Sequence, residues 1–355
     1  MLAPNASTAA GVSVSETTAP KLTAVWRAVA LLSGVVASLP LKHYADAEGG
    51  RAEHSNRLLR RPHPSFTRFE LVELIMVHLL LSGNAYLVKQ RNGLAEVVGL
   101  LPVAPNQVIP KVDDDGVKTF ECPGKDQPRI TVGSDVILHI PGMGYDGARG
   151  WNPIAMCRQA LAVGLAAEEF SARFFSNGSH LGGILQTDSE LTPGQATEAK
   201  DTFIARTAGL AKAHEVAVLH KGLKYQQVGI APEDAQLIES RQFTIQDVGR
   251  LFGLPNHVLN EASGSTSWGS GLSEQVRGLL VFTMGPWISR IEDRLSDELA
   301  PEDEYFEFTR AGLLQSTTKE RYEVYKIGIE TGVLTIDECR EMENLPALDK
   351  PEEQE

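Results

Sequence analysis

The chain has 355 residues and a formal net charge of −13, with 42% hydrophobic and 22% charged residues. This length and ordinary apolar content favour a folded chain of two or three domains and exclude the disordered and fibrous classes. The last 55 residues contain 15 acidic and 6 basic side chains. An acidic balance argues against a surface that grips nucleic acid phosphates, and it is compatible with a protein past which DNA slides without sticking.

Residues 1–22 are small and polar, without a basic start or an apolar centre, so we expect a flexible N-terminal arm and no secretory signal. The two most apolar stretches, 24–41 and 71–81, are predicted to be core helices and not membrane spans. The first contains Arg27, and the second is too short to cross a bilayer. A reducing compartment without disulfides is indicated by three isolated cysteines: Cys122, Cys157 and Cys339.

Residues 23–152 begin with two helical patterns, at 23–39 and 66–81. Short strands are then expected at 86–90, 97–101, 108–112, 117–121 and 136–140. Because tight turns separate these strands, we predict an antiparallel sheet packed on the two helices, an α+β unit. The basic residues between the helices are expected on a solvated face, with DNA contact as the alternative: Arg57, Arg60 and Arg61.

A Gly-x-Gly-x-x-Gly pattern follows the last of these strands, at Gly142, Gly144 and Gly147. A dinucleotide-binding turn needs a helix that opens at the third glycine and a second strand that ends in an acidic residue about 20 positions on. Residues 149–153 intervene instead, and the acidic residues at 168–169 lie inside a helical pattern. A nicotinamide-dependent oxidoreductase therefore remains only as an alternative.

A long helix is predicted over 153–177 and carries Phe170 and Phe174. Their helical spacing favours packing against a neighbouring helix over stacking on nucleic acid bases. Residues 182–231 then predict a small, self-contained unit of one strand, one helix and two further strands. This unit is inserted between the first long helix and the next.

The second long helix opens at Pro232, which suits a first helical turn. Its apolar residues recur near a 3.6-residue period and include Leu237, Ile238, Ile245 and Val248. Both long helices carry apolar residues around much of their circumference, more than one partner helix within a protomer would cover. We therefore expect these residues, together with Phe170 and Phe174, to contact neighbouring subunits.

Residues 262–300 combine a loop with an interrupted helix. In the helix, Gly285 and Pro286 lie mid-pattern, where proline removes a backbone donor and is expected to bend the helix. The loop has no apolar period and much backbone freedom. It consists of Ser263, Gly264, Ser265, Thr266, Ser267, Trp268, Gly269, Ser270 and Gly271.

The rest of the chain predicts a short strand at 305–308, which we expect to join the sheet of residues 86–140. Helices are expected at 318–330 and 335–343, followed by an acidic tail at 349–355. No His, Cys or carboxylate spacing in the chain suggests a metal site, and no nucleophile elbow or phosphate-binding loop appears. The sequence therefore predicts no catalytic residue, no metal, no cofactor and no enzyme activity.

Several ordered motifs resemble the portal proteins of tailed bacteriophages, of the lambdoid siphophage type. They include Gly83-Asn84-Ala85-Tyr86, Arg241-Gln242-Phe243, Arg250-Leu251-Phe252-Gly253-Leu254-Pro255 and Gly285-Pro286-Trp287-Ile288. With further matches they span roughly residues 23–346. The resemblance implies these divisions: flexible arm 1–22, wing 23–152, stem helix 153–181, clip 182–231, second stem helix 232–261, tunnel loop and kinked helix 262–300, wing return strand 301–313, crown and acidic tail 314–355.

The resemblance also implies a function: a homo-oligomeric ring, dodecameric in this family, at one vertex of a virion capsid, assembled in the bacterial host cytoplasm. Double-stranded DNA would pass through its tunnel during packaging and ejection. The implied partners are the terminase large subunit, a head–tail connector and the major capsid protein, with no membrane contact. The predicted docking residues of the clip are Lys200, Arg206 and Lys212. Another ring-forming head–tail connector is the alternative.

Overall fold

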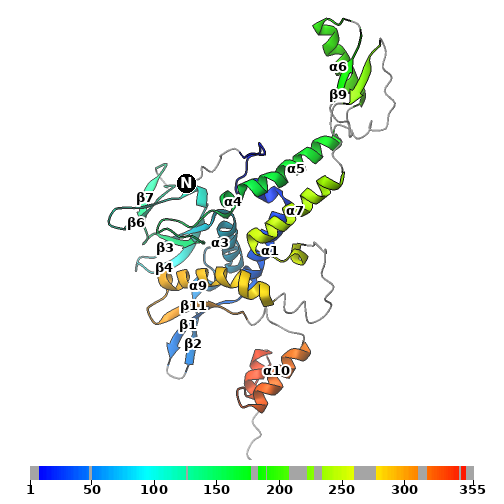
Figure 1. The fold of residues 1–355 in the computed structure, drawn as a ribbon. Coiled ribbons are helices and arrows are strands. Elements are labelled where there is room, and N and C mark those ends of the chain that lie inside the picture. The colour runs from blue at the N-terminus through cyan, green and yellow to red at the C-terminus, as the bar shows by residue number, and fades with distance from the viewer. Residues whose placement is uncertain are drawn as a thin grey trace, which may run out of the picture.

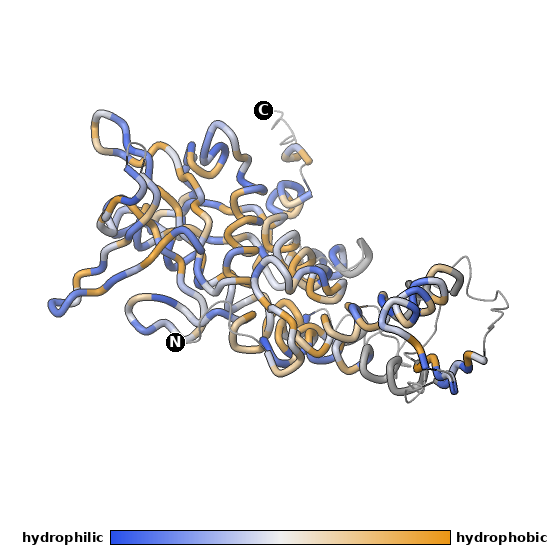
Figure 2. The backbone as a smooth tube through the Cα atoms, turned by 90° about the horizontal axis from the view of Figure 1, so that it is seen from above, coloured by the Kyte–Doolittle hydropathy of each residue, from blue (hydrophilic) through white to orange (hydrophobic). Residues whose placement is uncertain are grey.

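A computed structural model gives the structure of this chain. Its centre is a body of helices and small sheets, from which two long helices lead away to a small distal unit (Figure 1). Figure 2 shows that apolar segments gather in the helical part of the body and that the strand tips are more hydrophilic. The described residues are 8–47, 50–124, 127–176, 183–188, 190–207, 222–227, 234–259, 277–310, 318–343 and 345–348.

Two apolar helices, α1 (Thr23–Ser38) and α3 (Arg68–Ser82), form the centre of the main hydrophobic core. At the start of α3 the Thr67 hydroxyl accepts a hydrogen bond from the backbone N–H of Glu70, and the Glu70 carboxylate accepts one from the N–H of Thr67. This reciprocal cap satisfies donors that the helix itself leaves free. Gly83, with a left-handed φ of 72°, ends the helix.

The segment before α1 packs on this core. Val14, Ala19 and Leu22 are 3%, 0% and 2% exposed, and a short 3₁₀ turn, η1 (Ala19–Lys21), leads into the helix. The backbone N–H of Ala9 also donates to the Gln159 side chain at 3.2 Å. The prediction of a flexible arm is therefore wrong for residues 8–22, because three apolar side chains in a polar stretch suffice to hold it.

The predicted single antiparallel sheet is instead two small sheets of three strands, with strand orders β4-β3-β8 and β5-β6-β7. A 3₁₀ turn that begins at a proline, η2 (Pro105–Gln107), separates β4 from β5 and explains the division. β7 was not anticipated, since its four residues are too few to show a clear alternation. The strands are β3 (Asn84–Arg91), β4 (Val97–Val103), β5 (Ile109–Val112), β6 (Lys118–Cys122), β7 (Ile130–Gly133) and β8 (Ile137–Pro141).

A third sheet brings distant parts of the chain together. β1 (Leu41–Ala47) lies between β2 (Gly50–His54) and β11 (Glu304–Phe308), and Leu41 is opposite Phe308. The expectation that residues 305–308 join the sheet of residues 86–140 is therefore wrong. Alternation in β11 buries Phe306 and Phe308 on one face, which directs them into the core beside β1.

The long helices are α5 (Arg158–Ser176) and α7 (Asp234–Phe252). The helix predicted over 153–177 is interrupted at Cys157, which separates the short α4 (Pro153–Met156) from α5. The basic residues Arg57, Arg60 and Arg61 are exposed, as expected, on and beside another short helix. The remaining elements are α2 (Arg57–Arg60), β9 (Gly183–Gln186), α6 (Pro193–Thr207), β10 (Lys224–Gln227), η4 (Asn256–Leu259), η5 (Leu279–Met284), α9 (Gly285–Leu299), α10 (Thr318–Glu330) and α11 (Ile336–Met342).

Candidate functional site

The paired long helices α5 and α7 lie side by side and run in opposite directions between the body and the distal unit, which comprises β9, α6 and β10 (Figure 1). Their contact is close near the body. A Cβ atom at Gly164 of α5 would overlap the methyl group of Thr244 on α7, so only glycine allows this approach. The pair therefore connects the body to the distal unit through two helices that are in direct contact.

Large apolar side chains remain uncovered along this pair. Val163 and Phe170 on α5 are 53% and 46% exposed, and Phe243 on α7 is 61% exposed. In contrast, Val248 is fully buried in the core of the protomer and Ile245 packs against the same core, so the predicted subunit contact is corrected for Val248. Phe170 stays a predicted interface residue. Three further predictions concern side chains outside the described part of the structure: Phe174, Leu237 and Ile238.

The distal unit has its own small apolar contact. β9 and β10 pair antiparallel with Leu185 opposite Tyr225, and the ring of Phe203 on α6 stacks on Tyr225 with centroids 5.2 Å apart. Lys200 is exposed on α6, where a partner can reach it. The second of the three strands predicted for this unit, at residues 215–220, lies outside the described residues. So do two predicted docking groups, Lys212 and the side chain of Arg206.

The helix formed by residues 277–299 is here called the proline helix. It changes from π-helical to α-helical winding immediately before Pro286. Six residues before it, Leu279–Met284, are π-helical, and α9 begins at Gly285. Proline lacks an N–H and crowds the carbonyl four residues earlier, and a wider π turn relieves both problems. A bend at Gly285 and Pro286 stays a prediction. The loop expected at 263–271 lies outside the described residues.

The π-helical turn is fastened to the end of α7. The Thr283 hydroxyl donates a hydrogen bond to the Gly253 carbonyl at 2.6 Å. Gly253 has a left-handed φ of 68°, and a Cβ atom there would lie 3.1 Å from the Thr283 hydroxyl oxygen. One contact therefore joins the proline helix to the C-terminal end of a long helix. The sequence carried no signal for it, since the two residues are 30 positions apart.

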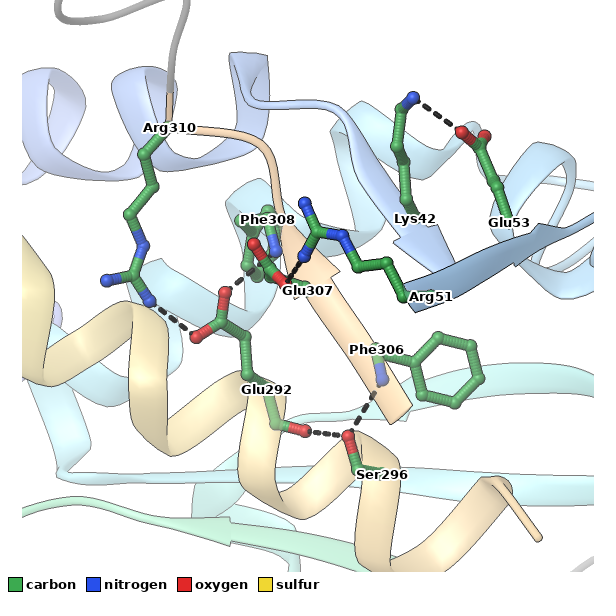
Figure 3. Close-up of polar contacts among 9 residues, drawn as sticks. All are labelled: Lys42, Arg51, Glu53, Glu292, Ser296, Phe306, Glu307, Phe308 and Arg310. Carbon is green, nitrogen blue, oxygen red and sulfur yellow. Dashed lines mark hydrogen bonds and ion pairs between the residues drawn. The ribbon is translucent and has the colours of Figure 1, made fainter. Parts of the chain in front are cut away.

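Farther along, α9 is anchored to β11 by buried polar contacts (Figure 3). The Glu292 carboxylate accepts hydrogen bonds from the Phe308 N–H at 2.7 Å and from the Arg310 guanidinium at 2.6 Å. The Ser296 hydroxyl accepts from the Phe306 N–H at 2.9 Å. Burial raises the pKa of Glu292, whereas the Phe308 N–H and Arg310 act in the opposite direction.

The same helix is also tied to the sheet that contains β3. Lys89 on β3 has a side chain only 4% exposed and pairs with Glu298 at 2.7 Å. The guanidinium of Arg294 lies 5.8 Å from the ring centroid of Tyr145. With the contacts to β11, these interactions fix α9 against two sheets. The described part of the proline helix thus divides into a π-helical start, which packs on the core through Met284 and is joined to Gly253 by one hydrogen bond, and a remainder that polar contacts anchor to two sheets.

The glycine-rich stretch is a packing junction. The Gly142 N–H donates to the Gly83 carbonyl at 2.8 Å, and a Cβ atom at Gly150 would lie 2.6 Å from that same carbonyl oxygen. The Asn84 side chain accepts from the Gly150 N–H at 2.8 Å and donates to the Gly150 carbonyl at 3.1 Å. These glycines are required because backbone segments touch there, with no room for a Cβ atom.

A dinucleotide site is contradicted at this place. β8, which precedes the glycines, is antiparallel to its neighbour β3, whereas the dinucleotide fold needs parallel strands. No helix opens at Gly147; the next one begins at Pro153. The glycine pattern was therefore misleading about chemistry. Gly142 lies against the Gly83 backbone, Gly144 lies against the Trp151 ring, and Gly147 has a left-handed φ of 93°.

A buried polar network lies next to the junction. His139 contacts the Asn84 side-chain oxygen at 3.0 Å through Nε2 and the Lys118 ammonium at 2.7 Å through Nδ1. The Asn84 oxygen also accepts from the Gly150 N–H, so His139 donates through Nε2 and accepts through Nδ1 as a neutral ring. Burial, with help from Lys118, lowers the pKa of His139 to about 2. Burial also lowers the pKa of Lys118 to about 8.

Ligand chemistry is not indicated by the described residues. They contain no group of three or more His, Cys, Asp or Glu side chains placed to hold a metal ion. None of their helices is both long and apolar enough to cross a membrane. What the described structure offers is a set of surfaces: the paired long helices, the distal unit and the proline helix.

Comparison with known sequences gives a consistent result. The family model for the phage portal protein matches residues 23–344. A probable portal protein of Streptomyces phage phiC31 is 32% identical over 96% of this chain and 78% of its own length. The portal protein of Enterobacteria phage HK97 is 31% identical over 92% of this chain and 80% of its own length.

Solved structures share the fold. A crystal structure of an HK97-family phage portal protein from Corynebacterium diphtheriae matches with a TM-score of 0.64 at 19% identity, over 85% of this chain and 98% of that one. A chain in the neck of a native gene transfer agent particle, computed with C12 symmetry, matches with a TM-score of 0.58 at 20% identity, over 92% and 91% of the two chains. The family match covers nearly the whole chain. The chain therefore belongs to the phage portal protein family.

Proposed function

We propose that this chain assembles into a closed ring at one vertex of a virion capsid and forms the channel through which the genome enters and leaves. The observation that carries the proposal is the family match over residues 23–344, which includes the long helices, the distal unit and the proline helix. The C12 symmetry of the matching gene transfer agent neck supports twelve subunits. We expect no ATP hydrolysis by this subunit, because a separate terminase would drive packaging.

In this ring the paired long helices act as the stem and the distal unit acts as the clip. The clip is the natural docking place for the terminase large subunit and later for the head–tail connector, because it stands at the end of the stem, away from the body (Figure 1). The exposed ammonium of Lys200 is its docking candidate among the described side chains. The body is the candidate contact for the major capsid protein.

Double-stranded DNA would pass along the proline helix and the loop of residues 263–271. The net charge of −13 supports sliding, because a tunnel with few free cations does not trap phosphates by ion pairing. Serine hydroxyls and backbone groups of the loop would contact the DNA without sequence preference. The hydrogen bond between Thr283 and Gly253 joins the described segments that precede and follow this loop in the sequence.

Imaging of the purified protein tests the proposal. Negative-stain micrographs should show rings with a central hole, and the particle mass should be about twelve times the 38.6 kDa of one protomer. A protein that stays monomeric at high concentration, with or without capsid protein, would contradict it. A ring found only between head and tail and absent from packaging-competent proheads would instead favour the connector alternative.

A further inference from the structure

The helices α10 and α11 form a hairpin that Figure 1 draws apart from the other described elements. Its inner side is defined by Arg321, whose guanidinium pairs with Glu343 at 3.0 Å, and by Gly328, where a Cβ atom would lie 2.7 Å from the Leu334 side chain. Among its described residues only Cys339 is a buried apolar side chain. Two short helices with so little buried apolar surface are not stable alone, so the hairpin needs a partner.

The hairpin exposes two separate apolar surfaces. One is a ridge on α10 formed by Val324 and Ile327, which are 58% and 59% exposed and share a face because they are three positions apart. The other is a groove of about 510 Å³, whose apolar lining includes Tyr322, Ile329, Ile336 and Leu345. At 3.6 residues per turn, the ridge and the groove side of α10 are about half a turn apart.

We propose that the ridge of one subunit occupies the groove of the next subunit, so that α10–α11 hairpins join head to tail around the ring. The inference rests on the proposed ring function. Each subunit of a ring meets two neighbours through different surfaces, and a closed head-to-tail ring requires two complementary patches on opposite sides of each subunit. A second copy of this chain supplies both. DNA is a poorer occupant, because the hairpin has more acidic than basic side chains.

Cysteine cross-linking tests this arrangement in assembled rings. Because the natural Cys339 lines the groove, both cysteine variants also carry Cys339→Ala. The ridge–groove variant then has Val324→Cys and Ile336→Cys, and the matched ridge-only variant has Val324→Cys and Ile327→Cys. A short bismaleimide joins thiols without an oxidant. The ridge–groove variant should give a denaturing-gel ladder that extends from dimers to the full ring. The ridge-only variant and the parent chain, which contains the three natural cysteines, should give at least tenfold less product above the monomer.

The outcomes separate the possibilities. Intact rings in which the ridge–groove variant yields no ladder would overturn the inference and leave the proposed function standing. Dimers from the ridge-only variant would show two-fold pairing and would also overturn it. A parent chain that forms no rings would contradict the proposed function and this inference together. As a second readout, Ile327→Asp should lower the melting temperature of the ring by several degrees more than Val333→Asp, since Val333 is 76% exposed and outside both surfaces.

Discussion

At the scale of single residues, Glu292 connects the proline helix to the strand that returns to β1. Its carboxylate accepts hydrogen bonds from the Phe308 backbone N–H and from the Arg310 guanidinium, and the Glu292 side chain is only 11% exposed. Such a buried acceptor is expensive to lose, because its removal leaves a buried N–H without a partner. Surface ion pairs contribute far less.

Replacement of this carboxylate should therefore destabilise the body. Glu292→Ala is expected to cost about 2–3 kcal/mol of unfolding free energy, since the Phe308 N–H loses a charged acceptor. Thermal and denaturant unfolding of the protomer measure the loss. The matched control is Lys42→Ala, which breaks an exposed pair with Glu53 seen in the same view (Figure 3) and should cost about 0–1 kcal/mol. Equal losses in the two variants would show that Glu292 is no anchor.

Two histidines make stability depend on pH. Burial lowers the pKa of His78 to about 4 and that of His139 to about 2, whereas both groups titrate near 6.5 when unfolded. Below that value the unfolded chain binds more protons than the folded chain, so stability falls as the pH drops. For one histidine that stays neutral in the folded chain, the free energy of unfolding falls by at most about 1.4 kcal/mol for each pH unit.

The melting temperature should accordingly fall between about pH 7 and about pH 5. His78→Leu should make this dependence shallower without loss of stability at neutral pH, because His78 Nδ1 is buried without a hydrogen-bond partner in the described structure. His139→Leu should flatten the dependence as well but destabilise at every pH, since it breaks the contacts with Asn84 and Lys118. A melting temperature that stays constant over this range would contradict the assignment of neutral rings.

At the scale of elements, the proline helix has one fixed and one loosely held part. α9 is tied to two sheets by buried polar contacts. The π-helical turn packs on the core through Met284 and hydrogen-bonds to Gly253 through Thr283, while Phe282 is 82% exposed. The turn should therefore open locally more easily than α9.

Thr283→Val removes this hydrogen bond at nearly constant volume. Backbone hydrogen exchange over residues 277–284 is expected to rise several-fold, while α9 keeps its protection because Glu292 and Glu298 still hold it. The control is Thr197→Val on α6, whose hydroxyl bonds only within its own helix, to Pro193. Unchanged exchange at 277–284 would show that Thr283 does not fasten the turn.

The paired long helices carry a separate prediction about assembly. Phe170→Asp and Phe243→Asp place a carboxylate on an exposed surface of the protomer, so folding should be kept. In the ring the same change would bury an unpaired charge, which typically costs about 3–5 kcal/mol at each of the repeated interfaces. Mass photometry should then find protomers in place of rings. Lys200→Asp on the distal unit is the control and should assemble normally.

Normal ring assembly of the two phenylalanine variants would contradict this prediction. If both phenylalanine variants form rings as well as the parent chain does, then the long helices do not carry the subunit contact. The interface would then have to lie on the body or the α10–α11 hairpin. A variant that loses its folded circular dichroism spectrum would be replaced by Phe170→Gln and Phe243→Gln, which test the same surface without a charge.

At the scale of the whole molecule, the sequence was a good guide wherever local pattern decides structure. The helices around Val25 and Ile75, the strand at Tyr86 and the antiparallel character of the small sheets follow from periodicity and turns. The family itself was recognisable from short motifs such as Gly83-Asn84-Ala85-Tyr86, and the comparisons confirm it.

Contacts between segments far apart in the sequence could not be predicted from local patterns. β11 fits several sheet edges by pattern alone, and only the buried faces of Phe306 and Phe308 select β1. Whether Val248 faces a neighbour or the core depended on how α1 and α3 pack, which periodicity does not reveal. The glycines at 142–147 resembled a ligand motif because tight turns, close packing and phosphate binding all favour glycine.

The central claim is that the chain forms the single DNA channel of a capsid. Gold labelling of the chain in intact particles tests it most directly, with a small affinity tag on the exposed face of α6 and cryo-electron microscopy as the readout. The account predicts label at one vertex per head, the vertex that bears the tail, and a ring with a central channel at that place. Label at many vertices, label along the tail, or particles without label would contradict it.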